Sequence, residues 1–272
     1  MSTDQRTSSS GSSVSPDSDA RSLRARIRAL LVAVLLAGLG IAVGSVLVLA
    51  AGLLLRLAGV PITPVLSIVI SLALATGVGF GGVALLYLWY RDFDISYVGV
   101  RVPSLREFGY VVGGYFLTLG LVFSAAVVIS SVGVEGGTNN AAQIGMENPE
   151  VLLLLIPASI LLIGPGEELL YRGVVQNRIR ERFPAVVAIP VASLIFASIH
   201  YVSLSGAPSA RLISIAVLVL PTLVFGTVYE LTDNIVVPSL LHGAYNATLF
   251  SGLYFFVKYG GEMQQQAAFL FG

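Results

Sequence analysis

The chain has 272 residues, of which 56% are hydrophobic and 11% charged, and its mean hydropathy is +0.88. A soluble domain carries about 25% charged residues, so this composition excludes an ordinary soluble protein and predicts a polytopic membrane protein. The formal net charge of zero gives no indication of a nucleic-acid partner. Because there is no cysteine, disulfides, thiolate metal sites and a cysteine nucleophile are excluded.

The N-terminal residues are rich in Ser, Gly and Asp and nearly free of large apolar side chains. We expect residues 1–25 to form a disordered cytoplasmic tail, since nothing in them offsets the entropy of ordering. The apolar run that follows begins too late and is too long for a signal peptide.

Seven apolar runs follow, and we predict that each one spans the membrane as a helix. The predicted spans are 29–55, 65–90, 108–133, 151–171, 185–201, 209–231 and 235–257. The first two are rich in glycine, which favours tilt or packing through small residues. The fourth is short and is interrupted by Gly164-Pro165-Gly166, which predicts an irregular backbone that opens toward a wet cavity. The predicted fold is an all-α polytopic helical bundle with its active site inside.

The basic residues predict the orientation of the bundle. Most of them precede span 1 or lie between spans 2 and 3 or spans 4 and 5, and the other side carries only Arg56, Arg211 and Lys258. Basic residues accumulate on the cytoplasmic side, so we predict a cytoplasmic N-terminus and an outer C-terminus. This topology puts Glu167 at the cytoplasmic end of span 4 and His200 toward the outer end of span 5. The two then meet only if the spans tilt or their boundaries shift.

Ionisable side chains in a hydrocarbon core cost roughly 2.5–3.5 kcal/mol each on insertion scales and usually face one another or a wet cavity. Glu168 and Arg172 are four residues apart, so on a helix they share a face and can pair. Glu167 points about 100° away and can face a neighbouring helix. Because two carboxylates share one arginine, one carboxylate has no cation of its own, which suits a general base. A purely structural ion pair is the alternative for Glu168 and Arg172.

The chain has only two histidines, and both lie in apolar segments. A single histidine among apolar residues is commonly a packed core residue, but here two occur with Asn246 four residues after His242. The N–H groups of His242 and Asn246 can stabilise a developing oxyanion, and either histidine can bind a metal. No H-E-x-x-H motif is present, so a zincin site is not indicated.

Three motifs together resemble the CPBP family, which comprises type 2 CAAX prenyl proteases and bacteriocin-processing or immunity proteins. Glu167-Glu168-x-x-x-Arg172, Phe196-x-x-x-His200 and His242-x-x-x-Asn246 occur in the order of the family's motifs, and the similarity covers about residues 150–250. The resemblance implies that Glu167 and His200 activate water, that His242 and Asn246 stabilise the oxyanion, and that Glu168 and Arg172 support the site.

The resemblance also implies an intramembrane endopeptidase in the cell membrane that cuts a membrane-associated peptide, CAAX-like or a leader. The expected domains are the tail 1–25, N-terminal helices 26–148, a catalytic domain 149–258 and a C-terminal tail 259–272. No cofactor is required on the favoured glutamate-type mechanism, and Zn²⁺ held by Glu167, His200 and His242 is the metal-dependent alternative. A non-catalytic scaffold or immunity protein and a proton-coupled transporter are the other functional hypotheses. The transporter is less favoured because no internal repeat is visible.

Overall fold

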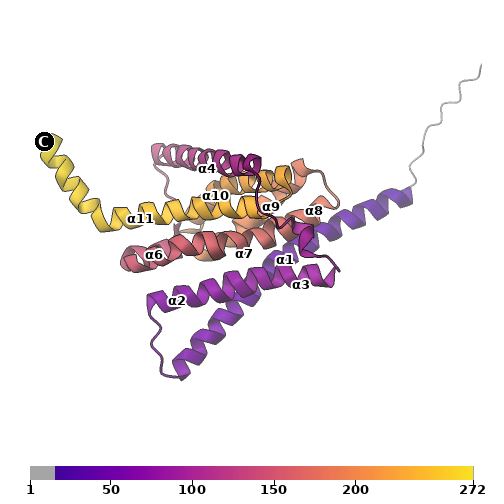
Figure 1. Cartoon of the computed structure of the whole chain (residues 1–272), viewed down its shortest axis with the longest axis horizontal. Helices are drawn as coiled ribbons and strands as arrows, with labels where there is room; N and C mark the ends of the chain where they lie inside the picture. Colours follow the sequence, from indigo (N-terminus) through magenta and orange to yellow (C-terminus); the bar gives the residue numbers. More distant parts are fainter. Residues whose placement is uncertain (1–15, 272) are drawn as a thin grey trace, which may run out of the picture.

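The computed structural model describes residues 16–271, and the surroundings of side chains between residues 22 and 261. It confirms the predicted all-α bundle (Figure 1). The helices of its N-terminal half are α1 (Pro16–Leu57), α2 (Pro64–Ser71), the π-helical η1 (Leu72–Gly82), α3 (Val83–Tyr90), the 3-10 turn η2 (Ile95–Val98) and α4 (Leu105–Ser131).

The second half contains β1 (Thr138–Asn139), α5 (Asn140–Glu147), α6 (Pro149–Ala158), the π-helical η3 (Ser159–Ile163), α7 (Gly164–Glu168), the π-helical η4 (Leu169–Gln176), α8 (Asn177–Arg180), α9 (Ala185–Ile199), the 3-10 turn η5 (His200–Ser203), β2 (Leu204–Ser205), α10 (Pro208–Thr232) and α11 (Val236–Phe271). The strands β1 and β2 pair antiparallel, with Thr138 opposite Ser205 and Asn139 opposite Leu204.

Six helices of the described chain are long and apolar enough to cross a membrane: Ser22–Leu57, Pro64–Tyr90, Leu105–Ser131, Pro149–Arg180, Ala185–Ser203 and Pro208–Thr232. The seventh predicted span, 235–257, lies in α11, which is not among the six. Its polar residues His242, Tyr245 and Asn246 lower the apolarity of that stretch. They face the interior of the bundle, where they line a cavity.

The glycine-rich first two spans pack as predicted, through small residues. A Cβ on Gly79 would lie 2.8 Å from the carbonyl oxygen of Gly40 and 2.9 Å from the Cα of Gly44, so α1 and η1 touch through their backbones. In lipid the hydrophobic effect does not drive helices together, so their association depends on van der Waals packing. The close approach of α1 and η1 increases the number of these contacts.

The fourth span differs from its prediction. It is neither short nor broken, but runs as one helix over Pro149–Arg180. The irregularity expected at Gly164-Pro165-Gly166 is present in another form, because π-helical stretches lie on both sides of α7. The hydropathy signal ends at residue 171 because Glu167, Glu168 and Arg172 are polar. Glu168 and Arg172 are buried in protein and Glu167 lines a cavity, so none of the three marks the membrane edge.

The two predicted tails also differ from the structure. Residues 16–25 are helical as the first part of α1, because extending an existing helix is easier than starting one. The rest of the predicted tail, residues 1–15, lies outside the described residues. The predicted C-terminal tail 259–272 continues α11 as helix as far as Phe271.

The two ends of the bundle consist of different elements and differ in their charged residues. At one end the start of α1, the 91–104 connection, α8 and the junction of α10 and α11 come together. Arg91 pairs with Glu181 at 3.2 Å, and the Arg101 guanidinium donates to the Thr232 carbonyl at 2.9 Å. At the other end lie β1, β2, α5 and the first turns of α2, α6 and α10. Figure 1 shows α3 and α8 toward the first end and α2 and α6 toward the second. We call the first the arginine-rich end.

Candidate active site

Two glycines allow the helix that carries the glutamates to touch the helix that carries His242. A Cβ on Gly164 would lie 2.5 Å from the Ser239 carbonyl oxygen, and one on Gly243 would lie 2.7 Å from the Cα of Ile160. Only a residue without a side chain permits this approach at either position. The close crossing of η3 and α7 with α11 brings Glu167 and Glu168 beside the imidazole of His242.

A chain of hydrogen bonds runs through the polar cluster. Arg172 Nη1 donates to Glu168 Oε1 at 2.9 Å, and His242 Nδ1 donates to the same oxygen at 2.8 Å. Asn246 Nδ2 donates to His242 Nε2 at 3.1 Å. Because a carboxylate only accepts, Glu168 holds the proton of His242 on Nδ1 and leaves Nε2 as the acceptor for the amide of Asn246.

The cluster is buried and enclosed by aromatic rings. Glu168 is 0% exposed, Arg172 1% and His242 4%. The guanidinium of Arg172 lies 4.7 Å from the ring of Phe196 and 5.6 Å from that of Phe225, and its Nη2 donates to the Thr222 carbonyl at 3.1 Å. The ring of His242 stacks on Phe225 with centroids 4.8 Å apart. These contacts fix the arginine and the imidazole in place.

Sequence reasoning missed Phe225 and Thr222, both of which come from α10. No charge marks either residue, and the Thr222 contact uses a backbone carbonyl that any residue supplies. Phe225 is one aromatic residue within an apolar span, and the sequence does not indicate that its ring stacks on a histidine.

Glu167 lies differently from Glu168. Its side chain is 12% exposed, its Oε2 is 3.9 Å from His242 Nε2, and it lines the cavity. Within the described part of the chain its carboxylate accepts no hydrogen bond. The prediction that the two glutamates point in different directions is therefore confirmed, with Glu168 paired to Arg172 and Glu167 facing open space.

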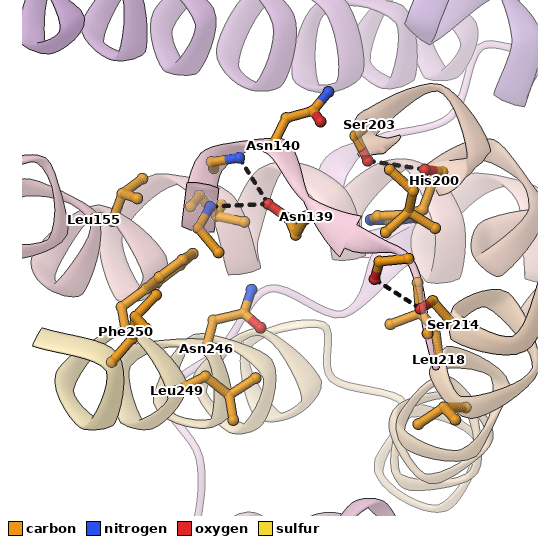
Figure 2. A pocket seen from close by; sticks show the side chains of 18 of the residues that line it. Asn139, Asn140, Leu155, His200, Ser203, Ser214, Leu218, Asn246, Leu249 and Phe250 are labelled. Atoms are coloured by element: carbon orange, nitrogen blue, oxygen red, sulfur yellow. Dashed lines mark hydrogen bonds between the residues drawn. The ribbon is translucent and has the colours of Figure 1, made fainter. Parts of the chain in front are cut away.

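His200 directly follows α9 as the first residue of η5, and it lies on another wall of the same cavity (Figure 2). Its Nδ1 donates to the Phe196 carbonyl at 2.9 Å, which leaves Nε2 with a free lone pair. The Phe196 ring contacts both imidazoles, with centroids 4.7 Å from His200 and 6.0 Å from His242. Phe196 is thus a packing partner of both histidines.

The cavity joins these residues in one space of about 920 Å³. Glu167, His200, His242 and Asn246 all line it, and they come from three helical segments. Its remaining walls are mostly apolar, with polar side chains toward the loops, where Asn139, Asn140 and Ser203 lie (Figure 2). Such a space accommodates a peptide segment with apolar side chains and offers it few but defined polar contacts.

The structure brings together the residues that the topology had placed at different depths. The fourth helix continues to Arg180, so Glu167 lies in its interior rather than at its end. The hydrogen bonds also differ from the expectation that His242 donates to an oxyanion. Its Nδ1 is bonded to Glu168 and its Nε2 accepts from Asn246.

The metal alternative does not fit the side chains as they are arranged. No group of three His, Asp or Glu side chains within the described residues is placed to hold a metal ion. Of the three expected ligands, His242 has both ring nitrogens in hydrogen bonds, and Nδ1 of His200 is bonded to the Phe196 carbonyl.

The polar cluster lies in the part of the chain that resembles known proteins. Residues 149–248 match the model of the family described as type II CAAX prenyl endopeptidase Rce1-like. No curated protein and no solved structure matches the chain significantly. The matched segment runs from α6 into α11 and contains every residue of the hydrogen-bonded chain together with Glu167 and His200. The family match supports a CAAX-type protease embedded in the membrane. The segment 149–248 thus resembles the CPBP/CAAX protease family.

Proposed function

We propose that this protein is an intramembrane endopeptidase that hydrolyses a peptide bond in a membrane-associated substrate, CAAX-like or a leader peptide. The observation that carries the proposal is the cavity itself. Glu167, whose carboxylate accepts no hydrogen bond from the described residues, and Asn246, whose amide is held by a buried hydrogen-bond chain, line the same cavity in the segment that matches the protease family.

Glu167 is the proposed general base. It removes a proton from a water molecule, and the water oxygen forms a bond to the carbonyl carbon of the substrate. Its carboxylate suits this role because no arginine or lysine of the described residues pairs with it and its side chain is only 12% exposed. His200, whose Nε2 has a free lone pair, orients the same water from the facing wall. When the C–N bond breaks, the proton held by Glu167 passes to the leaving amine.

Asn246 is the proposed oxyanion donor. Its Nδ2 carries two hydrogens, and one of them is used by His242. The second is free to donate to the oxygen that becomes negative when water adds. Arg172, Glu168 and His242 then act as positioning residues, because each holds the next one in the chain and together they fix the direction of the amide.

We also propose that the N-terminus is cytoplasmic, as the distribution of arginines predicts. Among the basic residues that gather at the arginine-rich end, Arg24, Arg26, Arg28, Arg101, Arg106 and Arg182 have exposed side chains. The opposite end carries Arg56, Arg211 and Lys258.

The test is cleavage of prenylated CAAX-like and leader peptides by the purified protein in detergent. Wild type is compared with Glu167→Gln and with the matched control Glu150→Gln, an exposed carboxylate at the start of α6 that does not line the cavity. We expect cleavage by wild type and by the control only. Cleavage by Glu167→Gln at the wild-type rate would remove Glu167 from the mechanism. A folded wild type that cuts none of the peptides would favour the non-catalytic scaffold.

A further inference from the structure

The cavity extends toward one end of the bundle only. From Glu167 and His242 in the middle, its lining continues to Asn139 and Asn140 and to Ser203 and Leu204, which lie in or beside the β1–β2 ribbon. Figure 2 shows this ribbon and Asn140 beside the cavity, with His200 and Asn246 on its walls. Among the described residues, no lining residue comes from the 91–104 connection, from α8 or from the first turns of α9.

The opening is therefore opposite the arginine-rich end. Contacts hold that end together, since Arg26 lies 5.9 Å from the ring of Phe183, Arg91 pairs with Glu181, and Arg180 pairs with Glu230 at 2.8 Å. The end with the opening has three exposed glutamates in or next to its loop, Glu135, Glu147 and Glu150, and that loop contains no basic residue. The positive-inside rule places the arginine-rich end in the cytoplasm and the opening outside it.

The mouth has the chemistry of a passage for an extended peptide. Both residues of β1 are exposed, and Asn139 of β1 and Leu204 of β2 line the cavity, so the ribbon forms part of its wall. Polar side chains surround it, namely Ser67, Asn139, Asn140, Ser203 and Ser214. The amides of Asn139 and Asn140 have donors that can bond to the backbone of a peptide. Deeper in the cavity the lining becomes apolar until it reaches Glu167 and His242.

We infer that the cavity receives its substrate from the extracytoplasmic side, as an extended peptide segment that passes the β1–β2 ribbon to reach Glu167. The inference rests on the proposed function, because it assigns the side from which that substrate comes. It narrows the substrate class to membrane-associated proteins whose cleaved segment lies outside the cytoplasm or in the outer half of the membrane.

The absence of cysteine from the sequence makes a labelling test direct. Single variants Asn140→Cys and Thr138→Cys place a thiol at exposed positions of the mouth, and Val102→Cys places one at the arginine-rich end, where the native side chain is 91% exposed. A membrane-impermeant maleimide is added to intact cells, and then to permeabilised cells. We expect either mouth variant to react in intact cells, and Val102→Cys to react only after permeabilisation. Reaction of Val102→Cys in intact cells would overturn the inference, as would protection of both mouth variants.

A second measurement concerns the passage itself. The purified Asn140→Cys and Thr138→Cys proteins are coupled to a bulky maleimide, and peptide cleavage is compared with that of the same variants before coupling. We expect loss of cleavage for both, and no change when Val102→Cys is coupled. Unchanged cleavage after complete coupling at both mouth positions would show that the substrate enters elsewhere. Because the labelling pattern does not depend on activity, it distinguishes failure of this inference from failure of the proposed function.

Discussion

Carboxylate–arginine pairs occur in two regions of this molecule, beside the cavity and at the arginine-rich end, and their surroundings differ. In the Glu168–Arg172 pair the side chains are 0% and 2% exposed, and the carboxylate also accepts from His242. In the Arg180–Glu230 pair they are 34% and 28% exposed. The same two chemical groups thus form a pair that is buried in protein in one region and a pair that is partly exposed to solvent in the other.

The difference shows what each pair contributes. Removing one partner of a buried pair leaves an uncompensated charge, whereas water and salt compensate a partly exposed one. A buried pair also fixes the orientation of the side chains that hydrogen-bond to it, as Glu168 fixes the imidazole of His242. The cavity pair therefore holds the site in one geometry, and the pair at the arginine-rich end joins α8 to α10 with little effect on the cavity.

The largest effect is expected for Arg172→Ala. The change leaves the buried carboxylate of Glu168 without its cation and the Thr222 carbonyl without its donor. Breaking a buried pair costs about 3–5 kcal/mol, so we expect a strongly lowered melting temperature in detergent together with loss of cleavage. Arg172→Lys should restore only part of the stability, since an ammonium cannot reach both acceptors in the way the guanidinium does. If Arg172→Ala melts like wild type and is inactive, Arg172 instead contacts the substrate.

The sequence predicted most of the fold because the spans are long and apolar. Their approximate positions follow from hydropathy alone, and the contact between the first two follows from their glycines. The π-helical stretches η1, η3 and η4 could not be predicted, because they depend on how neighbouring helices pack. The end of the fourth span was placed too early, at residue 171, because hydropathy treats the buried charges of a site as if they faced water.

For the candidate site, the i,i+4 spacings predicted the Glu168–Arg172 pair and the His242–Asn246 pair, and both are hydrogen-bonded in the structure. The bond between Glu168 and His242 joins residues 74 positions apart, and no local pattern indicates it. It depends on the close approach at Gly164 and Gly243. The direction of the hydrogen bonds of His242 also depends on that contact. Because the sequence does not show the contact, His242 was expected to donate to the substrate and not to act as a positioning residue.

Glu167→Gln tests the chemical role of the glutamate that does not pair with an arginine. The substitution keeps the shape of the side chain and removes its negative charge and its ability to accept a proton. Loss of a general base lowers turnover by about 10²–10⁴-fold. Since its carboxylate accepts no hydrogen bond from the described residues, we expect the melting temperature to stay within error of wild type. A large fall in stability would mean that Glu167 belongs to the buried ion-pair network and that the two glutamates do not have separate roles.

Asn246→Ala tests the last link of the hydrogen-bond chain. Loss of one oxyanion donor costs roughly 2.7–4 kcal/mol of barrier, so we expect turnover to fall about 10²–10³-fold with a smaller change in stability. Thr227→Ala is the matched control, since Thr227 is exposed on α10 and its hydroxyl bonds only to its own helix. If Asn246→Ala and Thr227→Ala cleave at similar rates, another group stabilises the oxyanion.

The smallest effect is expected for Arg180→Ala, which removes the ion pair with Glu230 and a hydrogen bond to the Phe183 carbonyl at 2.8 Å. Partly exposed pairs contribute about 0.2–1 kcal/mol, because solvent screens them and both side chains lose freedom when they pair. The melting temperature should therefore fall slightly, and cleavage should be unchanged. The difference in melting temperature between wild type and variant should become smaller as salt is added to both. Unfolding of both variants in the same detergent gives the direct comparison with Arg172→Ala. Equal losses would contradict the distinction between the two regions, because they would mean that burial does not decide what an arginine–carboxylate pair contributes to this bundle.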